Sequence, residues 1–264
     1  MSEENPEIKD IVRLFEDCDE APLGLHSMIK TAIKNGFKNP VGQWYSPSQA
    51  LVLLRDTINY STHPALKRIK AIVAMDNCLA KNEVETLSEN WTNAMIIFVC
   101  LRLGTKSINH SYVDQLRNVF TFETSLGIIG GRPKHAVYFV GFHDDKFYCL
   151  DPHTSQKYKD LNSVDLDDVS IWDSFHCHFE PSYMKINELD PSCAIGFLVK
   201  NANEFNDLLN ELSQNGLIEI PHLEKIPSRF PSKLFTVVER RPSFSSPALR
   251  KLSFEEEDND FEIL

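Results

Sequence analysis

The chain has 264 residues, 42% hydrophobic and 25% charged, and this size and balance are typical of one large or two small soluble globular domains. Its 27 basic and 38 acidic residues give a net charge of −11, which argues against a nucleic-acid partner because phosphate attracts basic surfaces. No apolar run reaches the roughly 18–20 residues of a membrane span, and the acidic N-terminus lacks the apolar core of a secretory signal, so we expect a cytoplasmic protein without a transmembrane segment.

Helices are predicted at the start of the chain. Apolar residues recur at helical spacing within residues 8–35, and Gly36 is typical of a helix end. After a loop that carries Trp44, Ser46-Pro47 predicts the start of another helix, because proline at the first turn gives up no hydrogen bond there.

The middle of the chain is rich in predicted strands. The run 94–103 is apolar on both faces, which indicates an interior strand, and residues 76–93 before it read as a polar excursion. His143-Asp144-Asp145 forms the turn of a predicted hairpin. The predicted strands are residues 69–75, 94–103, 135–142, 146–150 and 194–199, and helices are predicted at 112–120 and 205–212.

The composition changes after residue 220. Prolines recur in residues 221–247, interrupted by one predicted strand at 234–239. Residues 251–264 hold six acids and one base, which contribute −5 to the net charge. We therefore divide the chain into a folded part, residues 1–240, and a disordered tail, residues 241–264. Serines that follow basic pairs predict that residues 241–254 are a phosphorylatable linker, and the alternative is a neutral tether.

The six cysteines, at positions 18, 78, 100, 149, 177 and 193, contain no Cys-x-x-Cys pair, which argues against zinc-ribbon and redox motifs and favours reduced thiols. His176-Cys177-His178 has metal-ligand residue types, but only Asp173 lies near it in sequence, and a site needs three or four ligands. We predict neither a metal nor a cofactor.

Leu150-Asp151-Pro152-His153 follows the predicted hairpin. Residues two apart on an extended chain point to the same side, and an Asp beside a His can orient the ring and stabilise the imidazolium. This pattern is the base half of a hydrolytic triad. The alternative is a strand end at which Asp151 only caps backbone groups.

A glycine-rich segment, residues 127–134, leads into the same hairpin and is predicted to be a loop. It lacks the Gly-Lys-Ser/Thr sequence of a phosphate-binding loop. Its glycines permit mobile backbone, so both a lid beside a site and an ordinary turn stay open.

The acidic tail ends in Phe261-Glu262-Ile263-Leu264. In an extended strand, Phe261 and Leu264 can enter two pockets of a partner while the backbone adds to a sheet edge. The alternative is a solvated acidic tail.

Taken together, these stretches resemble the autophagins, the cysteine proteases that process the ubiquitin-like modifiers of autophagy. The resemblance covers about residues 10–240 and the end of the tail. The matching stretches are Leu25-His26, Gly42-Gln43-Trp44-Tyr45-Ser46-Pro47, Leu101-Arg102-Leu103-Gly104, residues 125–134, Tyr138-Phe139-Val140-Gly141-Phe142, residues 150–156, Phe175-His176-Cys177, Leu189-Asp190-Pro191-Ser192, Ile195-Gly196-Phe197 and Phe261-Glu262-Ile263-Leu264.

The resemblance implies an α+β, papain-like cysteine protease fold that is incomplete at the N-terminus, with a mainly antiparallel sheet and packed helices. It also implies a Cys-His-Asp triad in which His153 matches the base and Asp151 the orienting carboxylate. The implied substrates are ubiquitin-like modifiers, cut after a C-terminal glycine, and their phosphatidylethanolamine conjugates.

The resemblance further assigns regulatory or substrate-binding residues. Gly130, Gly131, Arg132 and Pro133 match the loop that regulates the entrance in this family, and Trp44 matches the aromatic residue against which that loop rests.

One departure concerns the nucleophile, which in this family lies in a Trp-Gly-Cys-Met-Leu-Arg type segment that precedes every matched stretch. No cysteine here follows Trp-Gly, and we expect Cys149 to be a core residue, because a nucleophile normally lies at a helix N-terminus. Two interpretations stay open. The chain is either the C-terminal portion of a thiol protease of autophagy, a hydrolase associated with protein transport, or a catalytically inactive short form that only binds the modifier.

Overall fold

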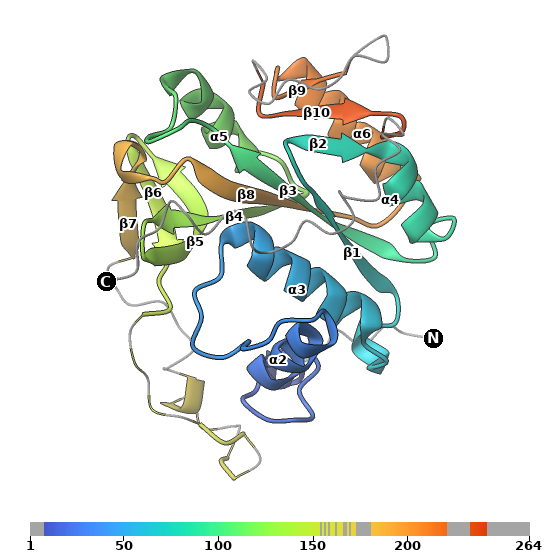
Figure 1. Cartoon of the computed structure of the whole chain (residues 1–264), viewed down its shortest axis with the longest axis vertical. Helices are drawn as coiled ribbons and strands as arrows, with labels where there is room; N and C mark the ends of the chain where they lie inside the picture. The colour runs from blue at the N-terminus through green and yellow to red at the C-terminus, as the bar shows by residue number, and fades with distance from the viewer. Residues whose placement is uncertain are drawn as a thin grey trace.

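A seven-stranded sheet forms the centre of the computed structural model, which describes residues 8–241 apart from 154, 156, 158, 162, 166–167, 169, 173–180 and 221–232 (Figure 1). Its strands, in spatial order, are β1 (Ile69–Ala74), β3 (Ala94–Arg102), β8 (Ser192–Val199), β4 (Ser125–Arg132), β5 (His135–His143), β6 (Lys146–Leu150) and β7 (Ser182–Lys185). Only β1 and β3 pair in parallel, and the other neighbours are antiparallel. The predicted α+β class with a mainly antiparallel sheet is confirmed, and β3 is an interior strand as expected.

Helices cover both faces of this sheet (Figure 1). One face packs against α3 (Pro47–Tyr60), on which α2 (Leu25–Lys34) packs in turn, and the short helix α1 (Ile8–Arg13) precedes them. The other face carries α4 (Lys81–Ser88), α5 (Val113–Val119), α6 (Ala202–Gln214) and a small parallel sheet in the order β2 (Cys78–Ala80), β10 (Phe235–Val238), β9 (Ile218–Glu219). Single 3-10 turns lie at Pro64–Leu66, His110–Tyr112 and Ile186–Glu188.

Local signals fix the predicted starts of two helices. At α3, the Ser46 hydroxyl accepts from the Gln49 backbone N–H, and the Gln49 side chain accepts from the Ser46 N–H, with Pro47 at the first turn. This reciprocal pair satisfies two N–H groups that the helix itself leaves unpaired. Asn201 caps α6 by accepting from the Glu204 N–H, in agreement with one of the two predicted caps.

Aromatic rings pack on one another in a cluster at the hairpin β5–β6. The ring of Phe147 lies 5.8 Å from Phe120, 6.1 Å from Phe139 and 6.3 Å from Phe142, measured between centroids. The guanidinium of Arg117, in α5, donates to the Asp144 carbonyl at the hairpin turn over 2.7 Å. These contacts hold both strands of the hairpin in place, and they therefore fix where the chain leaves β6.

Two predictions about local structure are wrong. Residues 76–93 are not only a polar excursion, because they contain β2 and α4; β2 pairs with β10, which lies far away in sequence and leaves no local signal. The glycine-rich segment 127–134 is not a loop, because residues 125–132 form β4 and only the turn at Pro133-Lys134 separates it from β5. Glycine suits this strand, since a Cβ at Gly130 would lie only 3.2 Å from the Cβ of Cys193.

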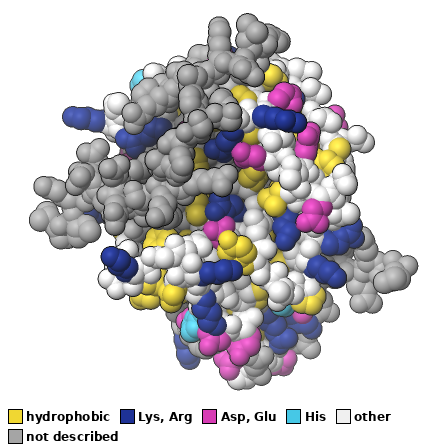
Figure 2. All heavy atoms as spheres, turned by 45° about the vertical axis from the view of Figure 1, so that its right-hand side comes forward, with side chains coloured by type: hydrophobic (Ala, Val, Ile, Leu, Met, Phe, Trp, Pro, Cys, Tyr) yellow, Lys and Arg dark blue, Asp and Glu magenta, His cyan; other side chains and the backbone are white. Residues whose placement is uncertain are grey.

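Charged side chains of both signs are interspersed over the described part of the face drawn in Figure 2. This distribution agrees with the nearly even charge balance of the chain outside its acidic end. Among the described helices, none combines the length and the apolar character that crossing a membrane requires.

The turn of the β4–β5 hairpin yields a prediction on stability. Gly131 has a φ of +147°, and a Cβ there would overlap the carbonyl oxygen of His135. We expect Gly131→Ala to cost about 2 kcal/mol or more, which lowers Tm by about 4–8 °C. The matched control is Gly141→Ala in β5, where a Cβ would meet no atom within 4 Å. Thermal unfolding measures both variants, and an equal Tm for the two would contradict the assigned conformation of Gly131.

Candidate active site

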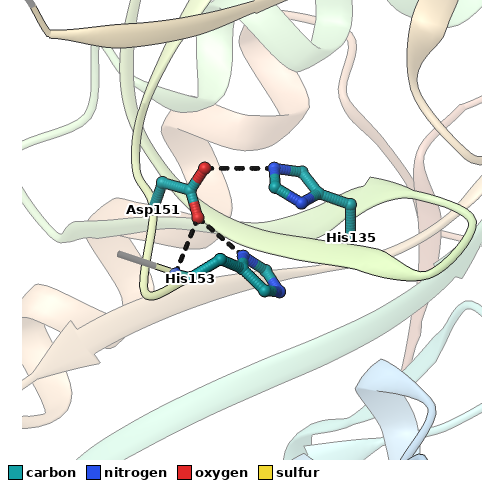
Figure 3. Close-up of side chains that lie close together, drawn as sticks. All are labelled: His135, Asp151 and His153. Carbon is teal, nitrogen blue, oxygen red and sulfur yellow. Dashed lines mark hydrogen bonds and ion pairs between the residues drawn. The ribbon is translucent and has the colours of Figure 1, made fainter. Parts of the chain in front are cut away.

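The chain turns sharply just after β6 and brings Asp151 and His153 together (Figure 3). The Asp151 Oδ1 atom accepts the backbone N–H of His153 over 2.9 Å and the ring Nδ1–H over 2.6 Å. The two residues therefore face each other across a tight turn at Pro152, not along the extended chain that the sequence suggested. In this geometry the backbone-capping role and the ring-orienting role of Asp151 occur together.

A second histidine, His135, completes the cluster and was missed by sequence reasoning. Its Nε2 atom lies 3.1 Å from Asp151 Oδ2, and its ring stacks on that of His153 with centroids 4.3 Å apart and planes 20° apart (Figure 3). The hairpin register contained the missing signal. Tyr138 of β5 pairs with Leu150, the last residue of β6, so the start of β5 lies beside the turn that follows β6.

The cluster is partly open to solvent. The exposed fraction is 24% for the side chain of Asp151, 25% for His135 and 41% for His153. Hydrogen bonding from the His153 backbone holds the pKa of Asp151 below its usual value, and the His153 ring and the charges of both imidazoles add to this effect. Among the described residues His153 bonds only to Asp151, so its Nε2 atom is available to exchange a proton with a reacting group.

His135, Asp151 and His153 also form the one group of described residues with metal-ligand atoms close enough for an ion, within 4.8 Å of one another. Imidazole binds a metal through a lone pair in the plane of its ring. Because the two ring planes are nearly parallel and 4.3 Å apart, their lone pairs do not converge on one point. The described geometry therefore suits an ion-pair cluster better than a coordination site.

Three described cysteines are unsuited to act as the nucleophile. Cys149 is 5% exposed within the main core, as predicted, and burial followed by the charge of Asp151 raises its pKa. Burial also raises the pKa of Cys78, and it raises the pKa of Cys193 to about 12. A thiol with a raised pKa is protonated at neutral pH, whereas the attacking species is the thiolate. The predicted pattern His176-Cys177-His178 lies outside the described residues.

The remaining predicted site residues fall in three places. Gly130, Gly131 and Arg132 lie within β4, Arg132 as its exposed last residue, and Pro133 begins the exposed two-residue turn that leads to His135. Trp44 is 55% exposed in the segment between α2 and α3. The last two, Phe261 and Leu264, lie outside the described residues.

The lowered pKa of Asp151 gives a prediction on pH dependence. The ionised carboxylate stabilises the fold above the unfolded-state pKa of about 3.9, and this contribution is lost as the pH falls through the lower folded-state pKa. We expect the carboxyl carbon of Asp151 to titrate below 3.8 in an NMR experiment. The stability difference between the wild type and Asp151→Asn should shrink over the same acidic range, and titration of Asp151 at or above 3.8 would contradict the described hydrogen bonds.

Comparison with known proteins identifies relatives over most of the chain. It is 32% identical over 269 residues to the cysteine protease atg-4.2 of Caenorhabditis elegans, an alignment that covers 96% of this chain and 51% of that protein. It is 33% identical over 237 residues to the human cysteine protease ATG4C, covering 87% and 48%. With the cysteine protease ATG4B of Gallus gallus, the identity is 29% over 302 residues, covering 96% and 72%. The chain thus spans about half the length of the first two relatives.

A family profile described as the peptidase C54 catalytic domain matches residues 1–211, well over half of the chain. The family has the papain-like cysteine protease fold, so this expectation is confirmed together with the resemblance to the autophagins. The chain belongs to the peptidase C54 family of cysteine proteases.

Proposed function

We propose that this chain supplies the histidine and aspartate of a thiol protease of autophagy that cleaves ubiquitin-like modifiers after a C-terminal glycine. The observation that carries the proposal is the bond of 2.6 Å from His153 Nδ1 to Asp151 Oδ1, in a chain that belongs to a cysteine protease family. That bond selects the tautomer with the proton on Nδ1 and leaves Nε2 to act as the base.

In the proposed reaction, a cysteine thiolate attacks the carbonyl carbon of the glycine, and the imidazolium of His153 donates a proton from Nε2 to the leaving amine. Water then hydrolyses the thioester, with His153 accepting its proton. Asp151 keeps the ring oriented and stabilises its positive charge. The buried cysteines Cys78, Cys149 and Cys193 are not proposed as the source of the thiolate, because burial raises the pKa of each thiol.

The same chemistry extends to the lipid conjugates. The link between a modifier and phosphatidylethanolamine is an amide after glycine, as a peptide bond is, so one Cys-His-Asp site can cleave both. This substrate range, a role in protein transport and a cytoplasmic location belong to the proposal.

A second candidate function is binding without cleavage. It is favoured by the buried state of the described thiols Cys78, Cys149 and Cys193. In that case the chain would hold the modifier through its surface and its tail, and the Asp151–His153 pair would be structural. Incubation of the chain by itself with a modifier precursor distinguishes the two, because trimming of the precursor would show that a cysteine of this chain serves as the nucleophile.

Regulation at the entrance is the proposed role of Gly130, Gly131, Arg132, Pro133 and Trp44. The tip of the β4–β5 hairpin is exposed, and the residue that follows it, His135, contacts Asp151. A movement of this tip would therefore shift His135 and change its contact with Asp151.

The triad assignment predicts a loss of activity. In a form of the chain that carries the family's nucleophile segment, we expect His153→Ala and Asp151→Ala to lower kcat/KM for precursor cleavage on the order of 10³-fold. The control is His143→Ala, an exposed histidine of the same hairpin whose described side-chain contact is an ion pair with its neighbour Asp144. If Asp151→Ala kept the rate within a few-fold, the orienting role of Asp151 would be lost.

We further propose that the tail binds a ubiquitin-like partner as an added strand, with Phe261 and Leu264 in two pockets and the acids before them facing a basic rim. Binding of a peptide of residues 252–264 should be micromolar, because an unordered tail must be fixed on a small interface. Titration of the modifier with this peptide and with a Phe261→Ala, Leu264→Ala version measures the effect. Equal affinities would show that the acids alone attract the partner.

A further inference from the structure

The carboxylate of Asp151 holds two imidazoles instead of one. Oδ1 receives both hydrogen bonds from His153, and Oδ2 lies 3.1 Å from Nε2 of His135. The two stacked rings face the carboxylate from the same side, His135 from the start of β5 and His153 from the turn after β6 (Figure 3). Neither oxygen is therefore left to solvent alone.

The backbone of His135 is held by the central sheet. His135 is the first residue of β5 and pairs with Arg132 of β4, so its position is set by the sheet and not by the turn that carries His153. Its ring covers one face of the His153 ring at 4.3 Å. Asp151 and His153, in contrast, lie beyond the end of β6. A contact from the sheet to the carboxylate thus ties an irregular turn to a regular strand.

We propose that His135 is a positioning residue of the Asp151–His153 site, and that the ion pair of its Nε2 atom with Asp151 Oδ2 at 3.1 Å fixes the carboxylate that orients His153. This inference rests on the proposed function, because it concerns the same base. His135 acts through Asp151, since its Nε2 atom faces the carboxylate and the proton of the reaction is exchanged at Nε2 of His153. Without the contact from His135, the carboxylate of Asp151 is held through Oδ1 alone and can rotate about its Cβ–Cγ bond.

Two substitutions separate the polar contact of His135 with Asp151 from the stacking of its ring on His153. His135→Gln keeps an N–H donor at about the same reach and removes the ring, whereas His135→Phe keeps a stacking ring and removes the donor. In the form that carries the nucleophile segment, we expect His135→Phe to lower kcat about 10-fold to 100-fold with KM unchanged, and His135→Gln to stay within about 3-fold of the wild type. His143→Phe, at the other end of β5, is the matched control and should leave kcat unchanged.

A second readout needs no activity. In the chain by itself, the Nδ1–H proton of His153 should give a protected imidazole resonance in the wild type and in His135→Gln, and exchange with water should broaden it in His135→Phe. A wild-type kcat for His135→Phe would overturn the inference. Equal losses in both variants, with equally lowered Tm, would also overturn it, because they indicate a purely structural role.

The variants Asp151→Asn and His153→Asn, measured in the same preparation, separate this inference from the proposed function. If they lower the rate strongly while His135→Phe does not, only the positioning role is wrong. If they too leave the rate unchanged, the proposed function itself has failed.

Discussion

The candidate site depends on the contacts that the ionised carboxylate of Asp151 makes with His153 and His135. It lies in a partly exposed turn, where a side chain is normally free to rotate, and two hydrogen bonds from His153 and an ion pair with His135 hold it there. Hydrogen bonds to an ionised carboxylate are stronger than those between neutral groups, and they keep its pKa low. The carboxylate contacts both imidazole rings, so it links the turn that carries His153 to the strand that carries His135.

The hairpin carries this geometry because its two strands are held independently of the site. Phe147 of β6 packs against Phe120 and Phe139, and Arg117 of α5 donates a hydrogen bond to the carbonyl of Asp144 at the hairpin turn. A bulge between Phe139 and Gly141 shifts the pairing of β5 and β6 by one residue. Bulges re-aim the side chains beyond them. Here the shift lies in β5 and sets the pairing of Tyr138 with Leu150, from which the start of β5 and the turn after β6 continue.

Sequence reasoning predicted the parts of this structure whose signals are local. The hairpin turn, the capped helix at Ser46 and the buried strand 94–102 follow from neighbouring residues, and Asp151-Pro152-His153 follows from its spacing. The errors arise where tertiary contacts decide. The glycine at position 130 favours a loop when the sequence alone is considered, but in the structure it allows β4 to lie close to Cys193. The strand β2 is defined by its pairing with β10, which is distant in sequence. His135 was missed because its role appears only in the exact pairing of two strands, which a bulge displaces by one residue.

The contacts of Asp151 and His153 bear on both candidate functions. Within the described part of the chain these contacts come from the start of β5 and the turn after β6, so the pair keeps its geometry without a contact to a thiol. Burial keeps the described thiols Cys78, Cys149 and Cys193 protonated, which prevents a wrong cysteine from competing for the base. A protease and a binding form would therefore share the same preformed surface. What separates them is whether a thiolate lies within hydrogen-bond reach of His153 Nε2, since an oriented base without a nucleophile can bind an acyl-glycine end but cannot break its amide.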